Sequence, residues 1–243
     1  MHQAHMTIGG RAVAGASTFE VRNPSTGQVI GTAPNAAPAD LDSAVAAAQA
    51  AFTSWSKKSD AELQLACKAV TEKIAAHAEE LALLITQEQG KPLNGLGSRW
   101  EMGGASAWAS YTSGLSLPMN VLQDNAQGRV ELHRKPLGVV GSITPWNFPA
   151  AMIARKIAPA LAAGCTVVCK PAEDTPLTSL ALIALAQEAG VPPGVLNIVT
   201  ASREHTPEVV DVWLDDARVR KITFTGSTPV GKHLARSIDS RIL

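Results

Sequence analysis

The second half of this 243-residue chain alternates short apolar strands with helices, and this alternation limits the possible folds more than any other feature. Four segments rich in β-branched residues predict strands, each followed by a helical segment. The predicted strands are 139–144, 166–169, 195–199 and 221–224, and the predicted helices are 149–163, 177–189, 208–214 and 229–238. This order predicts an α/β fold whose parallel strands are joined by right-handed crossovers. Because such sheets bind ligands where strand C-termini meet helix N-termini, the residues after each strand are the candidate site.

The first third of the chain has helical periodicity. Apolar residues recur at helical spacing in 41–52, where Asp40 is a candidate N-cap, and again in 60–88. A third helix is predicted for 98–113, despite a glycine pair within it. None of these segments contains a recognisable chemical motif, which indicates amphipathic helices that pack against the rest of the protein.

Residues 117–136 separate these two regions and have the pattern of an exposed hairpin. A turn cluster at 124–128 is followed by alternating charged and apolar residues in 129–135. We therefore predict three parts: an N-terminal helical part at 1–116, the hairpin at 117–136, and the α/β segment at 137–243.

Composition excludes several classes of protein. The chain carries 21 Lys+Arg and 21 Asp+Glu, whereas nucleic acids and anionic membranes require a basic excess. No apolar run approaches the ~20 residues that cross a bilayer, and residues 1–6 lack the features of a signal peptide. The three cysteines imply no disulfide framework, and no histidine lies in a metal-ligand cluster. We expect a cytoplasmic globular protein with no nucleic-acid, membrane or metal partner.

A glycine-containing loop, 225–232, lies between the last predicted strand and helix. Glycines let a backbone approach a phosphate closely, and the helix N-terminus supplies free N–H groups. The string Gly226–Lys232 also fits the start of a P-loop, which leaves nucleoside-triphosphate binding as an alternative. That motif requires Ser or Thr next, where this chain has His233, and Pro229 removes one N–H group.

Two further turns follow predicted strands. Lys170 and Glu173 are a donor and a carboxylate suited to the vicinal hydroxyls of a ribose, and the carboxylate favours NAD over NADP; the alternative is a solvated loop pair. In the turn Pro145–Pro149, the Asn147 amide is suited to donate to a developing oxyanion, and its alternative role is a helix N-cap.

Five strings together resemble the aldehyde dehydrogenase superfamily: Ile143–Pro149, Ala162–Glu173, Phe224–Thr228, Glu88–Pro92 and Val21–Gly27. The resemblance runs through essentially the whole chain. It implies a Rossmann-like parallel sheet of the aldehyde dehydrogenase type, an N-terminal helical region and an oligomerisation hairpin, with the C-terminal catalytic domain absent. It also implies an NAD cofactor, with NADP less favoured, a small-molecule aldehyde substrate, and a homodimer or homotetramer in the full-length form.

The resemblance also assigns roles to individual residues. Asn147 resembles the oxyanion-hole donor. The residues expected to bind the coenzyme are Thr144, Trp146, Lys170, Pro171, Ala172, Glu173, Gly226, Ser227, Val230 and Gly231. Within this set, Lys170 and Glu173 resemble the ribose contacts. Arg155 resembles the residue of the succinate-semialdehyde subgroup that binds the distal carboxylate of the substrate, and its alternative role is a structural ion pair.

The family mechanism uses a cysteine thiolate, which forms a thiohemiacetal with the aldehyde, and a glutamate that activates water. The family strings that carry this cysteine and glutamate would follow position 243. The resemblance implies that the parent enzyme oxidises an aldehyde, with a carboxylated semialdehyde such as succinate semialdehyde as a candidate. Because Cys67, Cys165 and Cys169 resemble packing residues, we expect this chain alone to be inactive. The alternative function is a non-catalytic nucleotide-binding or assembly module.

Overall fold

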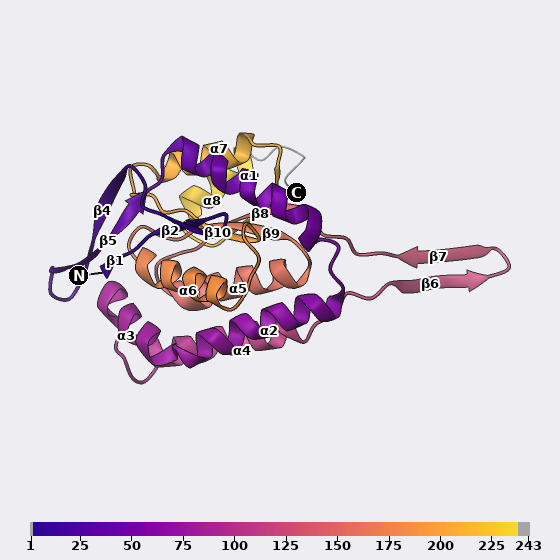
Figure 1. Cartoon of the computed structure of the whole chain (residues 1–243), viewed down its shortest axis with the longest axis horizontal. Helices are drawn as coiled ribbons and strands as arrows, with labels where there is room; N and C mark the ends of the chain where they lie inside the picture. The colour runs from indigo at the N-terminus through magenta and orange to yellow at the C-terminus, as the bar shows by residue number, and fades with distance from the viewer. Residues whose placement is uncertain (1, 238–243) are drawn as a thin grey trace.

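A computed structural model describes residues 2–237 (Figure 1). Its central sheet has six strands in the order β11-β8-β9-β10-β2-β3. The parallel part consists of β8 (Val139–Ile143), β9 (Thr166–Lys170), β10 (Leu196–Ile198) and β11 (Val219–Phe224). The α/β prediction for the second half of the chain is therefore confirmed, and all four predicted strands form with small shifts at their ends.

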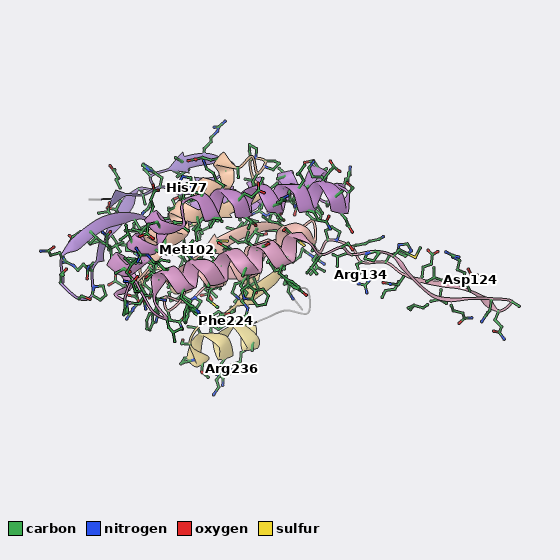
Figure 2. The ribbon with its side chains drawn as sticks, turned by 90° about the horizontal axis from the view of Figure 1, so that it is seen from below. His77, Met102, Asp124, Arg134, Phe224 and Arg236 are labelled. Atoms are coloured by element: carbon green, nitrogen blue, oxygen red, sulfur yellow. The ribbon has the colours of Figure 1, made fainter. Side chains whose placement is uncertain are left out.

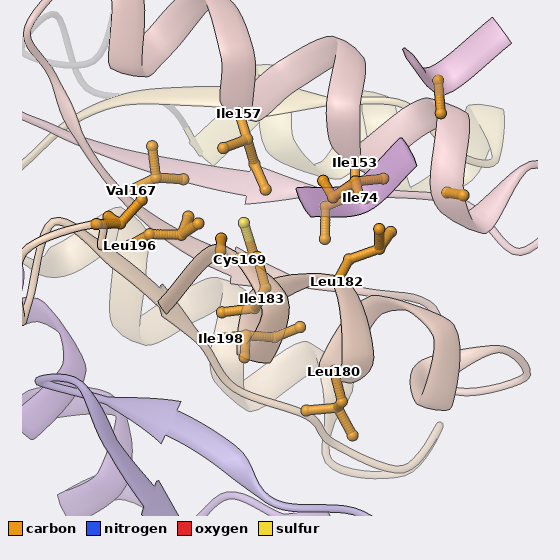
Figure 3. Packing of buried hydrophobic residues seen from close by; sticks show 14 of the residues in the cluster. Ile74, Ile153, Ile157, Val167, Cys169, Leu180, Leu182, Ile183, Leu196 and Ile198 are labelled. Carbon is orange, nitrogen blue, oxygen red and sulfur yellow. The ribbon is translucent and has the colours of Figure 1, made fainter. Parts of the chain in front are cut away.

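Both faces of the parallel strands are covered. In β9, Val167 and Cys169 pack with α5 (Pro149–Ala162) and α6 (Pro176–Glu188), as Figure 3 shows. The intervening Val168 belongs to the opposite core, with α1 (Pro38–Trp55) and α7 (Thr206–Asp215). A strand buried on both faces is apolar at consecutive positions, which is the pattern that made β9 recognisable.

A second helical layer covers α5 and α6. It consists of α2 (Asp60–Ala76), α3 (Ala78–Gln89) and α4 (Ser98–Ser113). The run 60–88, expected as one helix, is two helices, because His77 is both the C-cap of α2 and the N-cap of α3. The glycine pair in α4 does not interrupt the helix, so that prediction is confirmed.

The prediction of a helical first third is wrong for residues 2–35. Two short strands, β2 (Met6–Ile8) and β3 (Arg11–Val13), extend the central sheet in the antiparallel sense. A separate sheet contains β1 (His2–Gln3), β4 (Ser17–Arg22) and β5 (Val29–Asn35) in the order β1-β5-β4. Strands of two or three residues are too short for a period-2 pattern to be visible in the sequence.

Asp40 is not an N-cap. Helix α1 begins two residues earlier, at Pro38, and its N-cap is Ala37. The Asp40 carboxylate accepts a hydrogen bond from the backbone N–H of Ala37 at 2.9 Å. The carboxylate thus stabilises the helix N-terminus from the N3 position.

The predicted hairpin consists of β6 (Asn120–Asn125) and β7 (Gly128–Leu132), which pair in the antiparallel sense. Figure 2 shows it extending away from the body of the molecule between Arg134 and Asp124. Both strands are exposed throughout their length, and their exposed large apolar side chains are Val121, Leu122, Val130 and Leu132. Leu117 and Met119, in the segment before β6, are also exposed.

Helix α8 (Thr228–Ser237) follows β11, and its predicted end at Ile238 lies outside the described residues. No helix within residues 2–237 is long and apolar enough to cross a bilayer.

Candidate functional site

Three turns of the predicted site lie side by side at the C-terminal edge of the parallel strands. The backbone N–H of Thr144, after β8, donates to the carbonyl of Lys170 at the end of β9, at 3.2 Å. On the other side of β8, the N–H of Thr225 donates to the carbonyl of Ile143 at 3.1 Å. The sheet order therefore brings together the residues after β8, β9 and β11, although Thr144 and Thr225 are 81 positions apart in the sequence.

Glu173 lies between two cations at this edge. The ammonium of Lys170, whose side chain is only 2% exposed, lies 3.4 Å from Glu173 Oε2. The guanidinium of Arg203 donates to Glu173 Oε1 at 3.0 Å and also contacts Asp174. Burial opposes the charged form of Glu173, but Lys170 and Arg203 outweigh it and lower the pKa of its carboxyl group. Burial also lowers the pKa of Lys170, against the effect of Glu173.

This arrangement differs from a solvated loop pair, because Lys170 is buried. Arg203, which lies in the segment before α7 and 30 positions from Glu173, was not predicted as a site residue. The residues next to Arg203 in the sequence form no motif, because its contact with Glu173 arises only when neighbouring strand ends pack together.

The site has groups that fit a dinucleotide coenzyme. Glu173 has a carboxylate of the kind that binds ribose hydroxyls, and the first turn of α8 contains no acidic residue that would repel a pyrophosphate. The hydroxyl Oγ1 of Thr144 is buried and has no hydrogen-bond partner among the described residues. A buried hydroxyl without a partner at a strand end is a suitable contact for a polar ligand.

Packing against the Phe224 ring explains why residues 226 and 231 of the 225–232 loop are glycines. A Cβ atom on Gly226 would come within 2.7 Å of the Phe224 ring, and one on Gly231 within 3.2 Å. The ring of the last strand residue therefore packs on the loop, where a larger residue would displace it. Since α8 already begins at Thr228, Gly231 and Lys232 lie within the helix, a geometry that does not fit a P-loop.

Asn147 lies in the exposed turn before α5. Phe148, not Asn147, takes the N-cap position, and no side chain at that position caps the helix. Instead, Glu101 of α4 reaches across, and its Oε1 accepts from the backbone N–H groups of Ala150 at 2.8 Å and Ala151 at 3.2 Å. The Asn147 amide is thus left for another role.

Arg155 lies further along α5, with its guanidinium 4.8 Å from the ring centroid of Trp108 on α4. It forms no ion pair within residues 2–237, so the structural ion pair expected as its alternative is not present there. The next residue, Lys156, donates to the hydroxyl of Thr223 on β11 at 3.1 Å. Burial, together with Arg155, lowers the pKa of Lys156. Sequence reasoning missed both Trp108 and Lys156.

A pocket of about 440 Å³ opens beside these turns. Trp146 and Glu173 line it together with Val21, Arg22 and Glu88. The remaining predicted coenzyme residues do not line this pocket, so it adjoins the candidate coenzyme site without containing it.

The three cysteines are buried, as expected of packing residues. Burial raises the pKa of Cys67 to about 11 and that of Cys169 to about 12, which disfavours the thiolate. In the part of the chain that the structure describes, no group of three His, Cys, Asp or Glu side chains is placed to hold a metal ion.

Comparison with known proteins gives related sequences over most of the chain. The succinate-semialdehyde dehydrogenase of Arabidopsis thaliana mitochondria is 45% identical over 222 residues, which are 89% of this chain and 41% of the relative. The 3-sulfolactaldehyde dehydrogenase of Pseudomonas putida is 42% identical over 220 residues, 89% of this chain and 44% of the relative. The chain spans less than half the length of these curated relatives.

Solved structures of aldehyde dehydrogenases have the same fold as this chain. Succinate-semialdehyde dehydrogenase from Burkholderia pseudomallei superimposes with a TM-score of 0.90 at 40% identity, over 96% of this chain and 48% of that structure. Salicylaldehyde dehydrogenase from Pseudomonas putida G7 gives a TM-score of 0.93 at 28% identity, over 98% of this chain and 50% of that structure. Residues 12–243 match the profile of the Aldehyde dehydrogenase family. Three strand ends with their turns, the overall fold and the sequence match agree, and the chain belongs to the aldehyde dehydrogenase family.

Proposed function

We propose that the protein to which this chain contributes oxidises an aldehyde that carries a second, anionic group to the corresponding carboxylic acid, with NAD as the favoured coenzyme. The observation that carries this proposal is the shared edge of β8, β9 and β11. There, an amide donor at Asn147, a ribose-binding carboxylate at Glu173 and the N-terminus of α8 follow adjacent strands.

In the proposed reaction, a thiolate attacks the aldehyde carbon, and the carbonyl oxygen becomes an oxyanion in the tetrahedral adduct. The exposed amide of Asn147 donates to that oxygen, which stabilises the charge as it develops. A bound nicotinamide coenzyme would supply the acceptor for the hydride that leaves the aldehyde carbon as the tetrahedral adduct becomes a thioester. Water would then hydrolyse the thioester, which releases the acid and regenerates the thiol. Because Cys67, Cys165 and Cys169 are all buried, we propose that the thiolate belongs to none of them.

Arg155 supports an anionic aldehyde as the substrate. Its guanidinium is exposed, stacks on Trp108 and has no carboxylate partner in the described part of the chain. A free guanidinium is suited to bidentate recognition of a carboxylate or sulfonate. The two curated relatives are named for succinate semialdehyde and 3-sulfolactaldehyde, aldehydes that carry such groups.

The coenzyme preference rests on Glu173. Its carboxylate suits the 2′-hydroxyl of NAD and opposes the 2′-phosphate of NADP. Arg203 reduces this opposition by neutralising the carboxylate. Relatives from Sinorhizobium fredii and Schizosaccharomyces pombe are named as NADP(+) enzymes. We therefore propose a preference for NAD rather than exclusive use of it.

We propose that the β6–β7 hairpin is an oligomerisation element. An isolated two-stranded hairpin is marginally stable in water, and this one exposes apolar side chains along both strands (Figure 2). Burial of these side chains against another copy of the protein would remove them from water.

The expected cytoplasmic location also remains a prediction, since several relatives are named as mitochondrial enzymes.

The central experiment measures coenzyme reduction by the full-length protein with two aldehydes of equal chain length. One aldehyde, succinate semialdehyde, carries a distal carboxylate, and the other, butanal, does not. We expect kcat/KM to be at least about tenfold higher for the carboxylated aldehyde, a difference worth about 1.4 kcal/mol. Equal values would contradict the proposed substrate class, and no coenzyme reduction with any aldehyde would contradict the proposed reaction.

A further inference from the structure

A buried ion pair joins the second helical layer to the turn that carries Asn147. The ammonium of Lys91, in the segment between α3 and α4, lies 2.5 Å from Oε2 of Glu101 on α4. The Lys91 side chain is 11% exposed and that of Glu101 is 0% exposed. Removal of two charges from water is costly unless hydrogen bonds satisfy the remaining donors and acceptors.

The remaining contacts of this pair point to the turn and to the first residues of α5. Glu101 Oε1 accepts from the backbone N–H groups of Ala150 and Ala151, at 2.8 and 3.2 Å. Lys91 Nζ donates to the backbone carbonyl of Asn147 at 2.7 Å. The ion pair therefore holds the backbone at Asn147 and at the first turn of α5, which begins two residues later.

The next residue of the turn is fixed by the same cation. Lys91 Nζ lies 4.0 Å from the ring centroid of Phe148, a cation–π contact. The ring of Trp100, also on α4, meets Phe148 edge to face with centroids 6.2 Å apart. The carbonyl of Asn147 and the ring of Phe148 are thus both held from outside the turn.

These contacts define the direction of the Asn147 side chain. A hydrogen bond to its carbonyl, together with fixed residues on the C-terminal side, restricts the peptide plane and hence the direction of the Cα–Cβ bond. A donor that stabilises an oxyanion must lie 2.7–3.1 Å from the place where that oxygen forms, and errors of about 1 Å lower the rate strongly. An exposed turn without such contacts would not give that accuracy.

We propose that Lys91, held by Glu101, is a positioning residue for the amide donor of Asn147. This inference rests on the proposed function, because it takes Asn147 as the oxyanion donor. Lys91 acts only through the carbonyl of Asn147 and the ring of Phe148, and it does not touch the substrate.

A double-mutant cycle in the full-length enzyme tests this role. Asn147→Ala is expected to lower kcat roughly 100-fold. Lys91→Met, which keeps the length and apolar packing of the side chain, is expected to lower kcat roughly tenfold with little change in the KM for the aldehyde. In the Asn147→Ala background, Lys91→Met is expected to lower kcat less than about twofold, since its effect passes through the missing amide.

Lys91→Met leaves Glu101 as an unpaired buried charge, which can destabilise the fold. A second variant without that charge is therefore the control. Lys91→Met combined with Glu101→Gln removes both charges and keeps an oxygen that accepts from Ala150 and Ala151. Hydrogen exchange provides a readout independent of turnover. In both variants the amides of Trp146, Asn147 and Phe148 are expected to exchange faster, while those of β9 are unchanged. Lys91→Arg, which keeps the cation, should restore most of kcat.

Three results would overturn the inference. The first is an unchanged kcat in the doubly neutral variant, and the second is an equal loss from Lys91→Met with and without the Asn147 amide. The third is full activity of Asn147→Ala, which would contradict the proposed role of Asn147 as well. In the first two cases the loss caused by Asn147→Ala persists, so the proposed function stands while the role of Lys91 fails.

Discussion

Glu88, near the end of α3, accepts a hydrogen bond at 2.8 Å from the backbone N–H of Leu177, 89 positions later in the chain. Its second oxygen accepts from the N–H of Thr178 at the same distance. A buried carboxylate thus caps α6 from another layer of the fold, as Glu101 caps α5. Capping from a distance satisfies N–H groups that would otherwise be buried without partners.

The Glu88 contact predicts a pH-dependent stability. Burial raises the pKa of Glu88 from 4.5 to about 7, although hydrogen bonds from Thr178 and Leu177 oppose the shift. Between these two pH values the folded chain binds the proton more tightly than the unfolded chain does. Stability therefore falls as the pH rises from about 4.5 to about 7, by roughly 3 kcal/mol in total. The Glu88→Gln variant should lack this component.

Urea unfolding at pH 5 and pH 8 measures the contribution of Glu88 to the unfolding free energy. The unfolding free energy of the wild type should fall relative to that of Glu88→Gln as the pH rises. Glu80→Gln, an exposed change on the same helix, is the matched control and should follow the wild type. Parallel curves for the wild type and Glu88→Gln would show that Glu88 does not titrate in this range.

The cluster around Glu173 predicts how coenzyme choice changes. Glu173→Ser removes the carboxylate that opposes a 2′-phosphate, so the affinity for NADPH should rise roughly tenfold relative to NADH. Arg203→Ala removes the guanidinium that pairs with Glu173, so binding of NADPH should weaken several-fold more than binding of NADH. Fluorescence titration of both reduced coenzymes gives the two dissociation constants. Glu204→Ser, an exposed carboxylate next to Arg203, should leave the ratio unchanged. The same ratio in all three variants would argue against any role of this cluster in coenzyme choice.

Arg155 predicts a substrate-selective defect. Arg155→Ala should raise KM for carboxylated aldehydes roughly tenfold or more, and leave KM for uncharged aldehydes within about twofold. Trp108→Leu removes the ring on which the guanidinium stacks and should give a smaller defect of the same kind. Steady-state kinetics with the two aldehydes named above measure both effects, and Arg11→Ala on the edge strand β3 is the control. An equal rise in KM for both aldehydes would mean that Arg155 is structural.

The hairpin predicts a change of assembly without a loss of folding. Leu122, 65% exposed, and Val130, 47% exposed, lose little packing when replaced within this chain. The double variant Leu122→Glu with Val130→Glu should therefore keep its circular dichroism spectrum but form a smaller species in light scattering. Gln123→Glu adds a charge to the same strand without removing an apolar group, and serves as the control. An unchanged mass for the double variant would place the oligomer interface elsewhere.

Because all three cysteines of this chain are buried, we predict that none of them is the catalytic nucleophile. In the full-length enzyme, Cys67→Ala, Cys165→Ala and Cys169→Ala should each keep kcat within about threefold, provided that the variants remain folded. The 243-residue chain alone should give no aldehyde-dependent reduction of NAD. Turnover by this chain, abolished by one of the three substitutions, would identify that cysteine as the nucleophile.

The predictable parts of the fold are those with long local patterns. Strand β9 and helix α1 have enough consecutive residues for apolar runs or helical periodicity to appear. Strands β2 and β3 have three residues each, and β2 joins the sheet through β10, where Ile198 pairs with Thr7, 191 positions earlier in the sequence. No local pattern contains that information.

The same distinction applies to the candidate site. Glu173 was recognisable because it follows a strand within a family motif, whereas Arg203 lies in no such motif. Lys91 lies in the family string Glu88–Pro92, but nothing in that string indicates its contact with the turn at Asn147. Each reaches the site through a contact that only the folded chain creates. Residues expected to bind a ligand directly were therefore easier to predict than the residues that contact them in the folded chain.

The two capping glutamates have a consequence for engineering. A protein started at residue 137, to isolate the Rossmann-like segment, would lose both carboxylates and leave four helix N–H groups without their present partners. The boundary near residue 117 visible in the sequence is therefore unsuitable as a cutting point. A chimera that exchanges coenzyme-binding segments between relatives should carry α3 and α4 with them, because the donors and acceptors of these caps come from both sides of that boundary.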